Sequence, residues 1–108
     1  MTVSELAERA GLTAAVLPEG DREVTGVYIG DLLSWVMGRA TTGDAWITIM
    51  SNRNIAAVAT LVDAACVILA EGVQPDEGVA ALAEEKGINL LLSDEPSYET
   101  AMRLRDQL

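Results

Sequence analysis

From residue 45 onward, short apolar segments alternate with helix-like segments, and this alternation restricts the possible folds more than any other feature of the chain. Three segments are brief and strongly apolar, as strands are: 45–50, 65–70 and 88–92. Three others have helix-start residues followed by apolar residues at helical spacing: about 51–62, 74–87 and 97–107. Strands that alternate with helices through short connections predict βαβ units and a parallel sheet. Right-handed crossovers then place consecutive strands side by side, with their carboxyl ends along one edge.

The first third of the chain predicts one helix and two strands. Thr2 and Glu5 form a capping-box pattern at the start of a helix that stops at Gly11. Residues 12–17 are brief and apolar, and residues 23–29 carry β-branched and aromatic types, so both segments favour strands. The turn between them contains Pro, Gly and Asp.

A second helix is expected directly after residue 29. Asp31 is placed to cap this helix, and Gly38 is placed to end it. Its apolar residues share one face at helical spacing, and we expect them to point inward: Leu32, Leu33, Val36 and Met37. The elements together predict an α/β fold in residues 1–108, a single three-layer domain with a mostly parallel sheet flanked by helices.

The composition excludes several classes of function. The 108 residues include 17 Asp and Glu against 7 Lys and Arg, and a net charge of −10 repels nucleic acids and anionic membranes. Without histidine, and with Cys66 as its one cysteine, the chain has no usual metal site, disulfide framework or His-dependent mechanism. It shows neither a signal peptide nor a membrane span, so we expect a cytoplasmic protein. Binding or regulation without a cofactor is expected, rather than catalysis.

The most informative polar residues follow the predicted parallel strands. They come in three pairs: Ser51 and Asn52, Glu71 and Gly72, and Ser93 and Asp94. Ligands of open parallel sheets sit beyond the carboxyl ends of the strands, so these positions predict a small-molecule site. The first pair could instead cap the following helix. If Glu71 and Asp94 lay near one another, the two acids could support acid–base chemistry, but no aromatic sugar-binding cleft accompanies them.

Arg53 is notable because the chain has few cations. A positive charge at a helix start is unfavourable for the helix dipole, so this arginine could serve an anionic ligand or an acidic partner. An exposed arginine without a role is an equally good interpretation. Cys66 lies in an apolar run and is expected to be an inert core residue.

Residues 20–31 contain the densest motif of the chain. Its three glycines are spaced six and four apart, and no Lys follows, so neither the dinucleotide fingerprint nor a phosphate loop is present. Gly26 inside a strand predicts a bulge or a close backbone approach, and amides near Gly30 could face an anion. Alternatively, Asp21 and Arg22 cap a turn or form an ion pair, and the glycines only permit packing.

Read with gaps, five residues spell the letters for which the DRTGG domain is named: Asp21, Arg22, Thr25, Gly26 and Gly30. The chain resembles this family from about residue 4 to residue 106, including Asn54-Ile55, residues 59–63 and residues 83–88. The resemblance adds all five motif residues to the candidate ligand-binding set. After the final strand, residues 93–100 depart from the Thr, Asp, Thr and aromatic cluster of the relatives.

The resemblance implies an α/β domain similar to the N-terminal domain of HPr kinase/phosphorylase. Such domains occur alone or joined to other modules, including phosphotransacetylases and inorganic pyrophosphatases with CBS domains. Stand-alone clostridial members often accompany genes of hydrogenases and redox complexes. The implied role is regulation or interaction, with no catalytic activity.

The four aromatic residues, two Trp and two Tyr, are scarce core material, so most of them are expected to be buried. Trp35 is the expected exception, because its helix has enough other apolar residues for an inner face. An exposed Trp35 predicts a dimer interface, and a homodimer is the commonest arrangement. The sequence therefore predicts a homodimeric regulatory domain that binds a small ligand such as a nucleotide or metabolite. The alternative is a protein–protein interaction module of a redox, hydrogenase or metabolic enzyme complex, without a small ligand.

Overall fold

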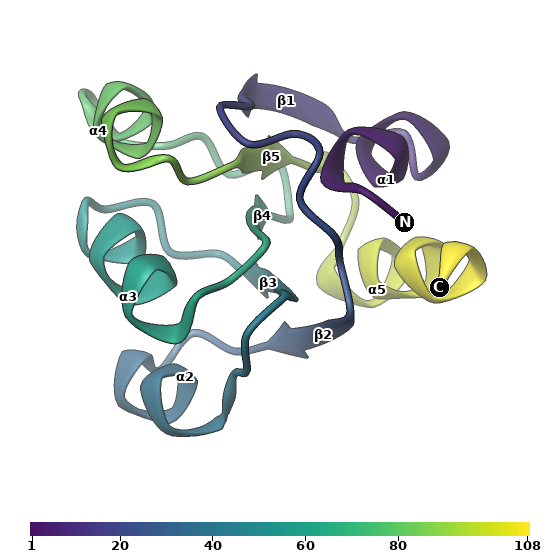
Figure 1. Ribbon diagram of the computed structural model, residues 1–108, viewed down its shortest axis with the longest axis horizontal. Helices are drawn as coiled ribbons and strands as arrows, with labels where there is room; N and C mark the ends of the chain where they lie inside the picture. Colours follow the sequence, from purple (N-terminus) through teal and green to yellow (C-terminus); the bar gives the residue numbers. More distant parts are fainter.

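Five strands form one sheet at the centre of the protein, which we describe over residues 1–108 from a computed structural model (Figure 1). The strands stand in the order β1-β5-β4-β3-β2. Their bounds are β1 Thr13–Val16, β2 Gly26–Ile29, β3 Asp44–Thr48, β4 Cys66–Leu69 and β5 Leu90–Leu92. Strands β2 to β5 are parallel to one another, and β1 pairs antiparallel with β5. The predicted mostly parallel sheet is confirmed.

Helices cover both faces of the sheet, three on one side and two on the other (Figure 1). The first group is α2 Leu33–Arg39, α3 Asn54–Val62 and α4 Val79–Lys86. The second group is α1 Val3–Arg9 and α5 Ser97–Gln107. Each helix of the first group connects two neighbouring parallel strands, and the strand order always steps in the same direction. Right-handed crossovers therefore put all three on one face.

The central strands are buried on both sides. Every residue of β3 and β4 is buried, and this explains the continuous apolar run of β4. The two polar residues of β3, Asp44 and Thr48, are buried with hydrogen-bond partners. Alternate side chains supply two separate clusters: Ile47 and Ile68 face α1 and α5, whereas Trp46 and Val67 face α2 to α4. Burying each such side chain contributes about 1.5–3 kcal/mol, so the middle of the sheet carries much of the stability.

Several predicted helix boundaries are confirmed. The Thr2 hydroxyl accepts from the Glu5 amide, and the Glu5 carboxylate accepts from the Thr2 amide, so the capping box forms as expected. Gly87 ends α4 with a left-handed φ of 72°. The last helix spans the predicted residues 97–107. With 11 residues it is also the longest, and no helix is both long and apolar enough to cross a bilayer.

The prediction for α2 was wrong in its details. Asp31 does not cap the helix: its Oδ1 accepts from the Thr48 hydroxyl and the Ile49 amide at the end of β3. Gly38 lies inside the helix, which ends one residue later. Of the four residues expected to face inward, Val36 is buried and Leu33 is partly buried, but Leu32 and Met37 are exposed. Leu32 precedes the helix as its N-cap residue in extended conformation, so it does not share the helical face.

Two further expectations fail at element starts. Helix α4 begins at Val79 rather than near Pro75, because residues 74–76 form a loop in which the Asp76 amide donates to the Ser51 carbonyl. Gly26 is the first residue of β2 and not an interior residue, and the register of β2 with β3 shows no bulge.

The aromatic residues are less buried than the sequence suggested. Only Trp46 is fully buried, and its indole Nε1 donates to the Gly30 carbonyl at 2.9 Å. Tyr28 is partly buried, and Tyr98 is exposed. Trp35 is 52 % exposed, as expected, and the Arg39 guanidinium lies 3.7 Å above its ring.

Candidate functional site

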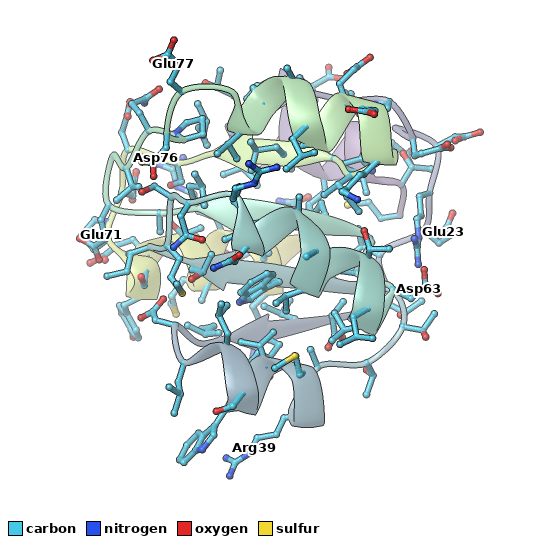
Figure 2. The ribbon with its side chains drawn as sticks, turned by 90° about the vertical axis from the view of Figure 1, so that its left-hand side faces the viewer. Glu23, Arg39, Asp63, Glu71, Asp76 and Glu77 are labelled. Carbon is cyan, nitrogen blue, oxygen red and sulfur yellow. The ribbon has the colours of Figure 1, made fainter.

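The residues that follow the strands lie along one edge of the sheet, as predicted, and most of them are hydrogen-bonded to other residues of the chain. The Ser51 hydroxyl donates to Asp76 Oδ1 at 2.8 Å. Figure 2 places Glu71, Asp76 and Glu77 at this end of the molecule. The Asn52 carboxamide oxygen accepts from the Asn54 amide at 2.9 Å, which is the capping alternative rather than a free ligand contact.

Around β4 and β5, the candidate residues form hydrogen bonds that connect the sheet to the start of α5. The Glu71 and Gly72 amides donate to the Glu95 and Ser93 carbonyls, and Glu71 Oε2 accepts from the Ser97 amide at 2.7 Å. Glu71 has a left-handed φ of 64°, which marks a tight turn directly after β4. Through these hydrogen bonds Glu71 fixes the first turn of α5 to the end of β4.

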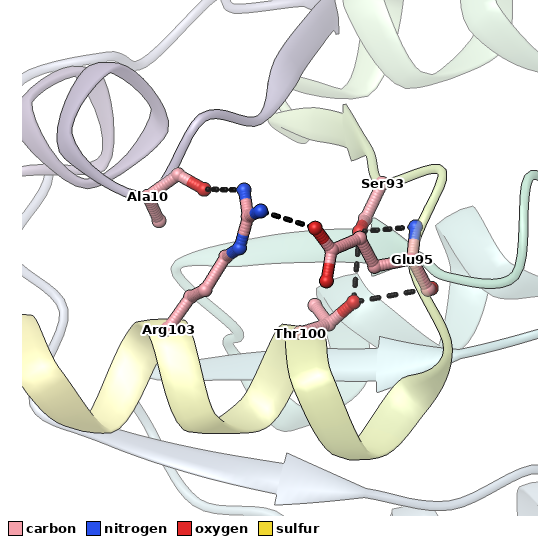
Figure 3. Close-up of polar contacts among 5 residues, drawn as sticks. All are labelled: Ala10, Ser93, Glu95, Thr100 and Arg103. Carbon is pink, nitrogen blue, oxygen red and sulfur yellow. Dashed lines mark hydrogen bonds and ion pairs between the residues drawn. The ribbon is translucent and has the colours of Figure 1, made fainter.

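Ser93 belongs to a small network at the start of α5 (Figure 3). Its hydroxyl lies 2.7 Å from the hydroxyl of the fully buried Thr100 and accepts from the Glu95 amide. Arg103 pairs with the Glu95 carboxylate and donates to the Ala10 carbonyl at 3.2 Å, which ties α5 to the end of α1. Of the last predicted pair, only Asp94 is exposed at the edge.

The motif residues fall at two different ends of the sheet. Asp21, Arg22, Thr25 and Gly26 come at or before the start of β2, whereas Gly30 follows its end. Arg22 Nη2 lies 2.8 Å from Asp63 Oδ1 and donates to the Asp63 carbonyl at 2.7 Å. Asp63 lies at the end of the molecule opposite Glu71 and Asp76 (Figure 2). The structure therefore does not bring the motif together with the strand-end residues, except at Gly30.

The two internal motif glycines make room for neighbouring side chains. A Cβ at Gly26 would lie 2.6 Å from Asp44 Oδ1, and a Cβ at Gly30 would lie 2.8 Å from the Tyr28 ring. Thr25 joins β2 to the turn before β3, because its amide donates to the Gly43 carbonyl and its hydroxyl to the Thr42 carbonyl. These contacts match the packing interpretation of the motif, in which Arg22 forms an ion pair.

Arg53 lines a cavity of about 270 Å³ on the α3–α4 side of the strand-end edge. The remaining lining comes from α4 and the turn before it: Glu77, Gly78, Val79, Ala81, Leu82 and Glu85. Arg53 forms no ion pair within the chain, so its guanidinium and the two carboxylates are free for a ligand. Sequence reasoning missed the α4 residues, because only the packing of α4 against α3 brings them to Arg53.

A second cavity, of about 440 Å³, lies between β2 and α5. Thr25, Gly26, Val27 and Ile29 line it from the sheet, and Ala101, Arg105 and Leu108 from the last two turns. Two motif residues thus reach a cavity, but one on the opposite face from α2, α3 and α4. Nothing in the spacing of the α5 residues signals that they meet β2.

The strand-end edge lacks the crevice that the ligand rule requires. Such crevices form at a switch point, where successive crossovers leave in opposite directions and their helices lie on opposite faces. Here β2, β3, β4 and β5 follow one another in a single direction, so no two crossover helices diverge. The cavity beside Arg53 is the part of this edge that retains room for a ligand.

The remaining titratable candidates offer little chemistry. Cys66 is fully buried, and desolvation raises the pKa of its thiol to about 12, so it is an inert core residue as predicted. No three acidic or cysteine side chains lie close enough to hold a metal ion.

Comparison with known proteins gives a consistent result for the whole chain. The model of the DRTGG domain family matches residues 4–107. A solved structure with the same fold is that of the CBS and DRTGG domains of the regulatory region of Clostridium perfringens pyrophosphatase, complexed with the activator diadenosine tetraphosphate. The TM-score is 0.74 at 15 % identity, over 99 % of this chain and 47 % of that one, so this chain spans about half of its length. No curated protein matches the sequence.

Proposed function

The chain belongs to the DRTGG domain family, and from this membership we propose that it is a non-catalytic regulatory domain that binds a small ligand and acts as a homodimer. The solved relative supports this proposal, because its DRTGG domain is part of a regulatory region crystallised with a nucleotide activator. The activity of that whole pyrophosphatase does not transfer, since this chain corresponds to about half of the solved region.

The observation that carries the ligand proposal is the cavity beside Arg53. It joins one free guanidinium to the carboxylates of Glu77 and Glu85, over an apolar floor from Val79 and Leu82. A guanidinium binds a carboxylate or phosphate in a planar, bidentate manner, and the two carboxylates accept from an amine or amide. The cavity therefore suits a small polar molecule with both an anionic group and hydrogen-bond donors.

The assignment as non-catalytic has support from the polar residues themselves. The Ser93 hydroxyl is bound to Thr100 and the Glu95 amide, so it stands beside no base that could activate it, and the Glu71 carboxylate already accepts from the Ser97 amide. With no histidine and a buried, protonated Cys66, the chain offers neither a Ser–His nor a Cys–His pair.

Thermal unfolding in the presence of a ligand panel tests the proposal. The panel contains adenine mononucleotides and dinucleotides together with zwitterionic metabolites such as amino acids. A ligand present at about 100 times its Kd stabilises the native state by about 2.7 kcal/mol, which is a shift of several degrees for a domain of this size. If every member leaves the melting temperature unchanged, the ligand-binding proposal fails.

Arg53→Ala locates the site of any ligand that binds. Loss of a charge-assisted hydrogen bond costs about 1.5–3 kcal/mol, so the affinity should fall at least about tenfold. The matched control is Arg9→Ala, an exposed arginine on α1 whose one ion pair, with Glu5, is long at 3.9 Å. Equal affinity in both variants would move the ligand away from the cavity beside Arg53.

A second candidate function is an interaction module of a redox, hydrogenase or metabolic enzyme complex, without a small ligand. Exposed apolar side chains on and around α2 favour it, since Leu32 is 57 % and Trp35 52 % exposed. Two results together would support this candidate. No ligand changes the melting temperature, and the chain binds a purified enzyme subunit saturably, with the binding abolished in Trp35→Ala.

A further inference from the structure

The face of β2 that points away from α2 is the least covered part of the sheet. On this side α1 contacts β1 and α5 contacts β3, and no helix lies directly over β2 (Figure 1). Val27 and Ile29 point to this side and are 37 % and 50 % exposed. The lack of cover follows from the topology, because the three crossover helices all lie on the other face.

β2 is also an edge strand, and its shortness, with four residues, is its one protection. Natural edge strands avoid pairing with other chains by being short or by means of charged residues, proline or bulges. The other edge strand, β1, has an irregular register between Ala14 and Val16 and contacts both α1 and α4. In contrast, the segment Gly26–Ile29 contains no charge or proline, and its register with β3 is regular throughout. One edge of the sheet is therefore open to strand addition.

Charge favours a second copy of this chain as the occupant. With a net charge of −10, two copies repel each other wherever acidic surfaces meet. The seven residues that line the β2–α5 cavity include no acidic side chain and one cation, Arg105, which has no ion pair within the chain. This surface is thus one where two copies can approach closely.

The same surface is complementary to itself. Two identical strands that pair antiparallel are related by a two-fold axis, as an isologous dimer requires. In that arrangement the start of one β2 lies beside the end of the other. Arg105 shares a cavity with Thr25 and Gly26 at the start of β2, and the exposed Asp31 follows its end. Pairing brings these opposite charges together twice, and the two hydrogen bonds that Asp31 accepts within the chain use only its Oδ1.

We propose that the free edge of β2 and the β2–α5 cavity form the homodimer interface, with the two β2 strands paired antiparallel so that two five-stranded sheets become one. This interface rests on the proposed homodimer and names its location, which differs from the Trp35 surface of α2. Main-chain hydrogen bonds between strands supply direction, and burial of Val27 and Ile29 from both copies supplies apolar contact.

Sedimentation equilibrium of the full chain tests the interface. The wild type should sediment as a dimer at micromolar concentration, and Val27→Lys should raise the dimer Kd about 100-fold or more. Thr13→Lys is the matched control, since Thr13 is an exposed residue of the other edge strand, and its Kd should stay within about twofold of the wild type. A monomeric wild type at about 100 μM, or a Val27→Lys variant as dimeric as the wild type, overturns the proposal.

A second pair of variants keeps the test decisive if Val27→Lys fails to fold. Arg105→Glu changes a surface charge without an internal partner, and it should weaken the dimer at least about tenfold. Arg39→Glu makes the same change beside Trp35 and should leave the dimer intact. The opposite pattern would place the interface on α2, which refutes the β2 pairing but preserves the homodimer. Ligand-induced thermal shifts of the monomeric variant separately show whether the ligand-binding proposal holds.

Discussion

Gly26→Ala is expected to lower the free energy of unfolding by about 1–2 kcal/mol, because the added methyl group collides with a buried carboxylate. The Cβ would lie 2.6 Å from Asp44 Oδ1. Asp44 is 7 % exposed, and its Oδ2 accepts from the Thr41 amide at 2.8 Å and from the Thr41 hydroxyl at 3.3 Å. The carboxylate cannot turn away from residue 26 without weakening these bonds.

Two opposing effects determine the size of the change. Hydrogen bonds to a charged group contribute about 1.5–3 kcal/mol, and most of that is lost if the Asp44 side chain is displaced. Alanine also restricts the unfolded chain, which returns about 0.4–1 kcal/mol. Gly26 has no left-handed φ, so backbone strain adds nothing. The collision with Asp44 is therefore the larger effect, and the net result is destabilising.

Urea unfolding followed by tryptophan fluorescence measures the effect. For an m value of about 1–3 kcal/mol/M, the midpoint should fall by roughly 0.3–2 M. Gly38→Ala is the matched control: its Cβ meets nothing within 4 Å, and it lies inside α2, where alanine is favoured over glycine by about 0.5–1 kcal/mol. The two substitutions should thus change stability in opposite directions.

A double-mutant cycle separates the collision from other causes. In an Asp44→Ala background the carboxylate is absent, so Gly26→Ala should cost nothing or stabilise slightly. The reasoning is refuted if Gly26→Ala still destabilises that background by more than about 1 kcal/mol, or if the single variant is as stable as the wild type.

Three further predictions concern other contacts. Arg22→Lys should lower the free energy of unfolding by about 0.5–1 kcal/mol, measured by chemical denaturation. The guanidinium binds both the carboxylate and the carbonyl of the partly exposed Asp63, and an ammonium lacks the geometry to reach both. An unchanged midpoint would show that the pair does not stabilise the fold. The Thr2 amide and hydroxyl hold the pKa of Glu5 below 4.5, so its contribution is complete above pH 4.5 and is lost as the pH falls through the lowered value. In Glu5→Gln, the melting temperature should therefore fall less steeply with falling pH in this range than in the wild type. Equal slopes for the two proteins would contradict the stabilising role of the Glu5 carboxylate. Because burial raises the pKa of Cys66 to about 12, a thiol reagent at pH 8 should react only at the rate of unfolding; faster labelling would show that the residue is accessible.

The second half of the fold could be predicted because its local signals agree with the tertiary structure. Segments 65–70 and 88–92 contain β4 and β5, segment 45–50 overlaps β3, which begins one residue earlier at Asp44, and α5 has the expected bounds. Disagreement arose where one residue had two possible partners. Asp31 is a good capping residue, but the end of β3 offers it both a hydroxyl and an amide, and a local pattern does not reveal that competition.

The candidate site shows the same division. Strand-end residues could be located, because parallel strands place their carboxyl ends together. Their roles could not be predicted: Ser93 and Glu71 are occupied by Thr100 and Ser97 of α5, a helix distant in sequence from β4. Likewise, Arg53 was singled out for its charge, whereas Glu77 and Glu85 join it only because α4 packs on α3.

The position of the motif links the family to the proposed interface. Arg22 fixes the approach to β2 by holding Asp63 at the end of α3, and Thr25 bonds to the turn before β3. Gly26 then allows β2 to lie against Asp44 in regular register. Three motif residues thus serve to set the position of one four-residue edge strand. A strand so short gains little from its own pairing, so its position has to come from such contacts. If β2 is where two copies meet, the motif acts on the dimer through the strand that it positions. Arg22→Ala should then weaken the dimer in sedimentation experiments at temperatures where the domain stays folded, although Arg22 lies outside the β2–α5 cavity. An unchanged dimer in that variant would show that β2 keeps its place without this anchor.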